Sequence, residues 1–110
     1  MAKYNNRKVT IDGIKFDSMG EANRYQELKL LQRAGEISDL ELQPKFTLIP
    51  TFKKNGKTHR SITYKADFRY KDKGGNIVIE DFKGFETKDF IIKKKLFEYQ
   101  YPDLELKIVK

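Results

Sequence analysis

The sequence of 110 residues contains no cysteine, no tryptophan and a single histidine, and each absence excludes some chemistry. Without cysteine, neither a disulfide nor a thiolate-bound zinc ion can hold the fold together. His59 has no second histidine or cysteine as a partner, so we expect no zinc site and no nucleophilic triad. No glycine-rich loop precedes a predicted helix, which leaves nucleotide hydrolysis without support.

Long hydrophobic runs are also missing from the chain. No apolar stretch is long enough to span a bilayer, and there is no recognisable signal peptide. These absences predict an intracellular, cytoplasmic protein with no membrane partner. The sequence also lacks internal repeats and linkers, so we expect residues 1–110 to form one domain. An aromatic content of 13% is ample for a packed core and argues against disorder.

Basic residues outnumber acidic ones by 23 to 16, which gives a formal net charge of +7. This excess favours a polyanionic partner, and nucleic acid is the leading candidate. Two segments concentrate the charge, a loop at residues 53–60 and a predicted helix near the C-terminus. We expect phosphate contacts from Lys53, Lys54, Lys57, Arg60, Lys88 and Lys94. The alternative is that these residues form a solvated hairpin tip and an ordinary polar helix face.

The first third of the sequence predicts a hairpin followed by a helix. Polar residues 1–8 are expected to be loosely held or to face DNA, and residues 9–16 alternate around an Asp12-Gly13 turn. Ser18 is a good N-cap, and Gly35 occupies the position that usually ends a helix. The expected buried stripe of this helix consists of Met19, Ala22, Tyr25, Leu28, Leu31 and Ala34.

The remaining two thirds predict three strands, a helix and a last strand. The strands are expected over residues 40–51, 61–70 and 77–83. The helix covers residues 87–100 and ends before Pro102, and Ile92, Leu96 and Tyr99 are expected to face the core. Residues 104–108 alternate as a last strand. The order after the N-terminal hairpin is α-β-β-β-α-β, which predicts an α+β fold with helices flanking a mixed sheet.

The segment 77–84 carries the most informative pattern in the chain. Three aliphatic residues predict a buried strand, and the strand ends in two carboxylates, a lysine and a glycine. Side chains alternate along a strand, so Asp81 and Lys83 should share one face while Glu80 points the other way. An acid and a lysine in this arrangement form a plausible site for a metal ion and a phosphate.

Asp67, on the preceding strand, is expected to lie beside Asp81. A three-residue loop at residues 73–75 would pair Tyr70 with Val78 and Asp67 with Asp81. The two carboxylates would then be cross-strand neighbours, which repel each other unless a cation lies between them. A loop one residue longer or shorter would place them on opposite faces.

Glu21 is a third acidic candidate with two possible roles. Ser18 and Glu21 have the spacing of a capping box, in which the glutamate satisfies the helix N-terminus. Glu21 also lies at the edge of the predicted buried stripe, from which it could reach the sheet. Both roles stay open at this point.

This combination of a helix, a hairpin, an aliphatic strand and a second helix resembles the PD-(D/E)xK nuclease superfamily. Asp67, Asp81 and Lys83 match its motif, and Glu21 lies on the matching first helix. The segment 14–22 looks like small phage-encoded endonucleases related to Holliday-junction resolvases. The resemblance covers about residues 9–108, and one departure is Ala66, which stands where the family name has proline.

The resemblance implies a restriction-endonuclease-like core and Mg²⁺-dependent cleavage of DNA, with Mn²⁺ as a possible substitute. Asp67, Asp81, Glu21 and the Phe82 carbonyl oxygen would bind the metal, and Lys83 would orient water or stabilise the transition state. It further implies branched DNA as the substrate, a homodimer and the cytoplasm of a bacterial host. A non-catalytic DNA-binding module and an RNA endonuclease remain alternatives.

Overall fold

The computed structural model describes residues 8–110, so the expectation for residues 1–7 lies outside the described part of the chain. The described residues form two helices and ten strands. In chain order these are β1 (Val9–Ile11), β2 (Ile14–Phe16), α1 (Met19–Arg33), β3 (Ser38–Leu42), β4 (Lys45–Ile49), β5 (Phe52–Lys54), β6 (Lys57–His59), β7 (Ile62–Lys65), β8 (Phe68–Lys71), β9 (Ile77–Phe82), α2 (Lys88–Gln100) and β10 (Glu105–Val109). The predicted α+β class is confirmed.

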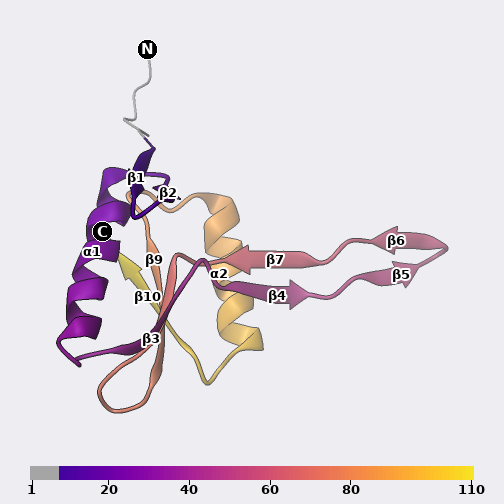
Figure 1. The fold of residues 1–110 in the computed structure, drawn as a ribbon. Coiled ribbons are helices and arrows are strands. Elements are labelled where there is room, and N and C mark those ends of the chain that lie inside the picture. The colour runs from indigo at the N-terminus through magenta and orange to yellow at the C-terminus, as the bar shows by residue number, and fades with distance from the viewer. Residues whose placement is uncertain (1–7) are drawn as a thin grey trace.

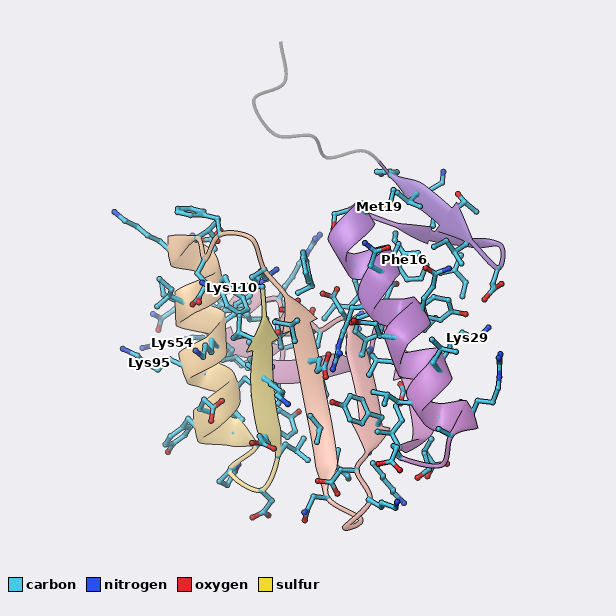
Figure 2. The ribbon with its side chains drawn as sticks, turned by 90° about the vertical axis from the view of Figure 1, so that its left-hand side faces the viewer. Phe16, Met19, Lys29, Lys54, Lys95 and Lys110 are labelled. Atoms are coloured by element: carbon cyan, nitrogen blue, oxygen red, sulfur yellow. The ribbon has the colours of Figure 1, made fainter. Side chains whose placement is uncertain are left out.

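A four-stranded mixed sheet lies between the two helices (Figures 1 and 2). Its strand order is β10-β9-β8-β3, with β9 and β10 parallel and the other pairs antiparallel. Val78 packs into a core shared with α1, whereas its neighbour Ile79 packs into a second core shared with α2. The aliphatic run in β9 is therefore buried on both faces, which explains why it does not alternate with polar residues.

The N-terminal hairpin and α1 follow the sequence prediction closely. Asp12 and Gly13 both have positive φ angles, 55° and 76°, as the predicted two-residue turn requires. The Ser18 side chain caps α1, and Ala34 is its C-cap, one residue before Gly35. The buried stripe is shorter than predicted, because Met19 is 57% exposed and Ala34 is also exposed. Helical side chains lean toward the N-terminus, so Met19 in the first position extends past the core (Figure 2).

Two of the predicted strands are each divided in two. Residues 40–51 contain β3, β4 and a break at Gln43 and Pro44, and residues 61–70 contain β7, β8 and a break at Ala66 and Asp67. The breaks face each other, since Gln43 N–H donates to the Asp67 carbonyl and Ala66 N–H donates to the Pro44 carbonyl. Gln43 has a positive φ of 54° and Pro44 has no N–H, so a regular ladder cannot continue through them. The two antiparallel segments are therefore interrupted at these breaks. Beyond the breaks they continue as the β4–β7 pair, which is separate from the four-stranded sheet.

The predicted core face of α2 is wrong at two of its three residues, since Leu96 packs against the core and Ile92 and Tyr99 do not. Phe90 and Phe97 are the buried residues of this helix, while Ile92 is 59% exposed and Tyr99 is 82% exposed. The helix carries apolar residues around much of its circumference, so more than one face could pack against the core. The two large phenylalanine rings fill the core better than the predicted Ile92 and Tyr99 would. Neither α1 nor α2 is long and apolar enough to cross a membrane.

Candidate active site

Three elements bring acidic side chains together at one end of β9. Glu21 comes from the first turn of α1, Asp67 from the bend before β8, and Asp81 from β9 itself. The Asp67 carboxyl group interacts with both Asp81 and Glu21, and these interactions contribute to its shifted pKa. Residues separated by up to 60 positions in the chain therefore form one acidic cluster, which we define as Glu21, Asp67 and Asp81.

The register of the β8–β9 hairpin agrees with the sequence prediction up to its last pair. Tyr70 pairs with Val78, and the regular ladder ends where Phe68 pairs with Glu80. Asp67 N–H donates to the Glu80 carbonyl at 3.0 Å, so the predicted regular pairing of Asp67 with Asp81 is not formed. The bend at Ala66 displaces Asp67 from the ladder, and its Oδ2 accepts a hydrogen bond of 2.7 Å from Phe82 N–H. The two carboxyl groups thus meet beyond the end of the ladder.

Asp81 is 1% exposed and is held by two neighbours. The Tyr64 hydroxyl donates to Asp81 Oδ2, and Lys83 Nζ lies 3.7 Å from the same oxygen. Lys83 Nζ also lies 4.8 Å from the centre of the Phe90 ring, a cation–π distance. Asp81 and Lys83 therefore share the face that the alternation predicts. Burial and the hydrogen bond to Asp81 together raise the pKa of Tyr64, which keeps the phenol protonated as a donor.

Two members of the acidic cluster, Asp67 and Glu21, have pKa values raised above those of isolated carboxyl groups. Burial is the largest cause that raises the pKa of Asp67 to about 8, and contact with Asp81 adds to it. Burial also raises the pKa of Glu21, and the negative charge of Asp17 raises it further. Near neutral pH Asp67 keeps a proton that a bound cation would displace.

Glu21 combines the two roles that the sequence left open. Its backbone N–H donates to Ser18 Oγ at 3.1 Å, as in a capping box. Its carboxylate interacts with Asp17 and with Asp67. The side chain thus satisfies the entry to α1 and belongs to the acidic cluster as well.

A cavity of about 490 Å³ opens over part of this cluster. Its lining carries both signs of charge and consists of Lys8, Asp17, Ser18, Glu21, Asp67, Phe82, Lys83 and Gly84. Asp81 is absent from the lining because it is buried. A second hollow of about 360 Å³, between β7 and the start of α2, shares Lys83 with the first. Lys83 is therefore accessible from both sides.

The donor chemistry of the acidic cluster fits a hard divalent cation, but its present geometry does not surround one. Within residues 8–110, no three acidic or histidine side chains are grouped so that they could hold a metal ion as placed. Asp81 Oδ2 is engaged by Tyr64 and Lys83, and Asp67 Oδ2 is engaged by Phe82 N–H. Binding of Mg²⁺ would require rotation of at least one of these side chains.

Gly20 allows α1 to approach the end of β9 closely. A Cβ atom at this position would lie 2.1 Å from the Phe82 ring, well inside van der Waals contact. Any larger residue would require the Phe82 ring or the first turn of α1 to move. This contact fixes the distance between Glu21, next to Gly20, and Asp81, next to Phe82.

A buried ion pair on the opposite face of β9 was not predicted from the sequence. Glu80 is fully buried, and Arg24 binds both of its carboxylate oxygens, at 2.8 and 2.6 Å. The Tyr70 hydroxyl donates to Glu80 as well. A buried carboxylate needs partners of this kind. The position of Glu80 directly after the aliphatic residues of β9 is therefore the sequence feature that could have predicted this network. Arg24 lies one turn after Glu21, so the network joins α1 to β9 beside the acidic cluster.

The six basic residues predicted to contact phosphate lie outside the cavity. Lys53, Lys54, Lys57 and Arg60 are exposed on or beside the β5–β6 hairpin, which projects from the body of the molecule (Figure 1). Lys88 is exposed at the start of α2, whereas Lys94 is half-buried. The residues that sequence reasoning missed near the site are Tyr64, Asp17 and Lys8. Asp17 lies within the segment 14–22, but no role was predicted for it.

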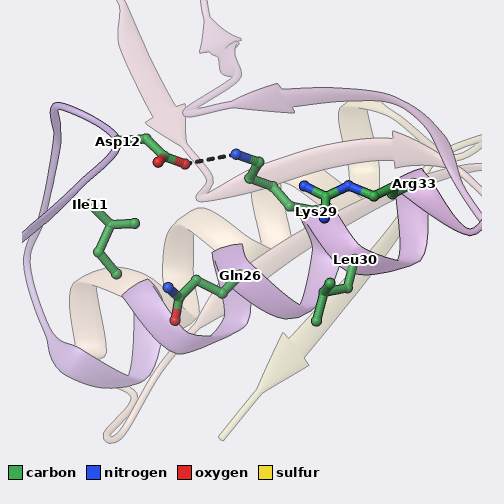
Figure 3. A pocket seen from close by; sticks show the side chains of 6 residues that line it. All are labelled: Ile11, Asp12, Gln26, Lys29, Leu30 and Arg33. Atoms are coloured by element: carbon green, nitrogen blue, oxygen red, sulfur yellow. Dashed lines mark hydrogen bonds and ion pairs between the residues drawn. The ribbon is translucent and has the colours of Figure 1, made fainter.

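A further cavity of about 430 Å³ lies where the β1–β2 turn meets the outer side of α1 (Figure 3). Asp12 Oδ2 accepts hydrogen bonds there from Lys29 Nζ at 2.7 Å and from the Tyr25 hydroxyl at 2.9 Å. The hydrogen bonds from Lys29 and Tyr25 lower the pKa of Asp12, and they connect the β1–β2 hairpin to α1. The other lining residues, such as Leu30 and Gln26, bring no further acid to this place. We assign this cavity a structural role.

Comparison with known proteins places the chain in a family. The searches of curated proteins and of solved structures gave no match. A family model described as "Protein of unknown function (DUF1064)" matches residues 1–110. Because this match covers the whole sequence, the chain belongs to the DUF1064 family.

Proposed function

We propose that this protein is a Mg²⁺-dependent endodeoxyribonuclease. The observation that carries the proposal is the convergence of Glu21, Asp67 and Asp81 beside Lys83 at the end of a buried strand. Three carboxyl groups in contact destabilise a fold that has no cation to place among them. The raised pKa values of Asp67 and Glu21 and the adjoining cavity support a site that binds a cation together with an anionic substrate.

The arrangement of the sheet and helices supports a restriction-endonuclease-like core. The helices and the strands of the four-stranded sheet occur in the order α1, β3, β8, β9, α2 and β10, with β9 and β10 parallel, and the helices cover opposite faces of the sheet. This is the order that the resemblance to PD-(D/E)xK nucleases implies. The assignment of the fold family is part of the proposal.

Each residue of the site has a defined task in this proposal. Glu21, Asp67 and Asp81, with the Phe82 carbonyl, would hold Mg²⁺, which when bound supplies positive charge to the phosphate and activates water. Lys83 donates hydrogen bonds to a non-bridging phosphate oxygen or to the attacking water. Tyr64 holds Asp81 in a fixed orientation. Mn²⁺ would fill the same role with the same oxygen donors.

The net charge of +7 supports nucleic acid as the substrate class. Branched DNA, as at a Holliday junction, follows from the resemblance, as does an action in the bacterial cytoplasm. Symmetric cleavage of a four-way junction requires two active sites, so we include a homodimer in the proposal. Exposed Ile92 on α2 and Ile62 on β7 line one hollow and are candidates for its interface.

The test is a comparison of Asp81→Asn and Lys83→Ala with Lys65→Ala, an exposed lysine on β7 that serves as the matched control. We expect the first two variants to lose at least about 100-fold in cleavage rate, because they remove a cation ligand and a transition-state donor. DNA binding measured in EDTA should survive in all three. Full cleavage by Asp81→Asn or Lys83→Ala would contradict the proposal.

The non-catalytic module and the RNA endonuclease are distinguished by the same assay. Tight DNA binding without cleavage under any divalent metal would identify a binding module. Cleavage of an RNA version of the substrate, with the DNA version left intact, would identify an RNA endonuclease.

A further inference from the structure

The β5–β6 hairpin with Arg60, residues 52–60, forms a projecting arm. Figure 1 shows it extending away from the body, and β5 and β6 pair only with each other. Every residue of the arm is exposed. An isolated two-stranded hairpin is marginally stable in water, so an arm of this kind contributes little to the core. Its composition must be explained by something outside the molecule.

The charge of the arm is uncompensated. Residues 52–60 include four basic side chains and no acidic one, and no arm residue forms an ion pair with another residue of the described range 8–110. Lys54 and Lys57 are directly opposite each other in the ladder, on either side of the Asn55-Gly56 turn. Like charges in this position repel and destabilise a hairpin. The repulsion would be relieved by an anionic partner placed along the arm.

The alternation of the strands sorts the side chains of the arm. Phe52 and His59 are opposite each other, and their rings stack with centroids 4.7 Å apart. This pair is two residues from Lys54 and Lys57, so all four side chains lie on one face. Lys53 and Thr58, which also face each other, lie on the other face. The arm therefore presents cationic groups on both faces and an aromatic pair near its base.

From this we infer that the arm is a nucleic-acid clamp that lies in the major groove of double-stranded DNA. The inference rests on the proposed function only for the choice of DNA as substrate. A two-stranded β-ribbon fits the major groove of B-form DNA, where cations on both faces can reach the phosphates of both strands. The deep, narrow major groove of A-form RNA does not admit it. A second copy of the chain is a poor occupant, because its own net charge is +7.

The experiment measures binding in EDTA, so that it does not depend on catalysis. Fluorescence anisotropy with a short labelled DNA duplex compares wild type with Lys54→Gln/Lys57→Gln. The control is Lys15→Gln/Lys107→Gln, which removes the same charge from exposed positions on β2 and β10. We expect the arm variant to bind about tenfold more weakly and to lower the slope of log affinity against log salt by about 2, and the control to change neither much.

Three results would overturn the inference. These are equal losses in the two double variants, equal binding of duplex RNA and duplex DNA by wild type, and binding to phosphatidylserine vesicles without binding to the duplex. Phe52→Ala adds a second readout, since it should weaken duplex binding while the charge stays the same. The proposed nuclease has a separate test, metal-dependent cleavage, so failure of the clamp and failure of the nuclease can be distinguished.

Discussion

Asp67 lies between two other carboxyl groups, and its protonation should be visible in the stability of the metal-free protein. Its pKa is raised to about 8 in the folded state, against about 3.9 in an unfolded chain. Between these values the folded state holds a proton that the unfolded state has released. The folded protein is therefore progressively destabilised as pH rises from about 4 to about 8, and the full penalty remains above pH 8.

The measurement is urea unfolding in EDTA across this pH range, for wild type and Asp67→Asn. We expect the variant to gain about 1–3 kcal/mol in free energy of unfolding relative to wild type by pH 8, after allowance for the partial exposure of Asp67. Other groups also change the free energy of unfolding with pH. Asp12, whose pKa is lowered, does so in the opposite direction to Asp67, and its contribution cancels when wild type and variant are compared at each pH. A difference that stays constant from pH 4 to pH 8 would show that Asp67 titrates normally.

At the scale of elements, the site depends on how closely α1 packs against β9. Gly20 removes the side chain that would collide with Phe82, and Arg24 binds Glu80 through two hydrogen bonds. The two contacts flank Glu21 on the helix. The acidic cluster is therefore positioned by packing and by a buried ion pair, and not by its own repelling charges.

The variant Gly20→Ala tests this packing. Overpacking should cost about 1–3 kcal/mol, which exceeds the gain of up to about 1 kcal/mol in helix propensity. Cleavage should fall as well, because Glu21 moves away from Asp67. Asn23→Ala, at an exposed position of the same helix, is the control and should change stability by less than about 0.5 kcal/mol. Urea unfolding and the cleavage rate are the two readouts, and equal stability of the two variants would contradict the packing argument.

The same elements show which features a sequence can predict and which it cannot. The Asp12-Gly13 turn, the Ser18 cap and the pairing of Tyr70 with Val78 follow from local rules, and the structure confirms them. The bend at Pro44 and Ala66 was missed, because it arises from two breaks that face each other across a ribbon. The core face of α2 was wrong at two of its three residues for a related reason, since tertiary packing chose between competing apolar faces.

The candidate site, like the fold, could be predicted where local rules apply and not where distant segments meet. Alternation in β9 places Asp81 and Lys83 on one face, and a salt-bridge distance of 3.7 Å agrees with it. The hydrogen bond from Tyr64 to Asp81 and the contact of Gly20 with Phe82 join distant segments, so no local pattern indicates them. The sequence also could not show that the acidic side chains would need to rotate to surround a cation.

At the scale of the whole molecule, positive charge and the acidic cluster have separate places. The cluster lies between the helices at the end of β9, and the arm extends beyond the sheet (Figure 1). A net charge of +7 attracts the nucleic acid as a whole, whereas the few acidic groups at the site attract the cation. This division allows carboxylates to lie close to a polyanionic substrate.

Cleavage of a labelled four-way DNA junction, a matched linear duplex and single strands tests the central claim most directly. Each substrate is incubated with Mg²⁺ and with EDTA, for wild type and Asp81→Asn. We predict cutting by wild type with Mg²⁺ only, with the junction preferred and no cutting by the variant. Cutting of all three substrates would keep the nuclease and remove the branch preference. An absence of cutting with every divalent metal, or cutting that persists in EDTA, would contradict the account.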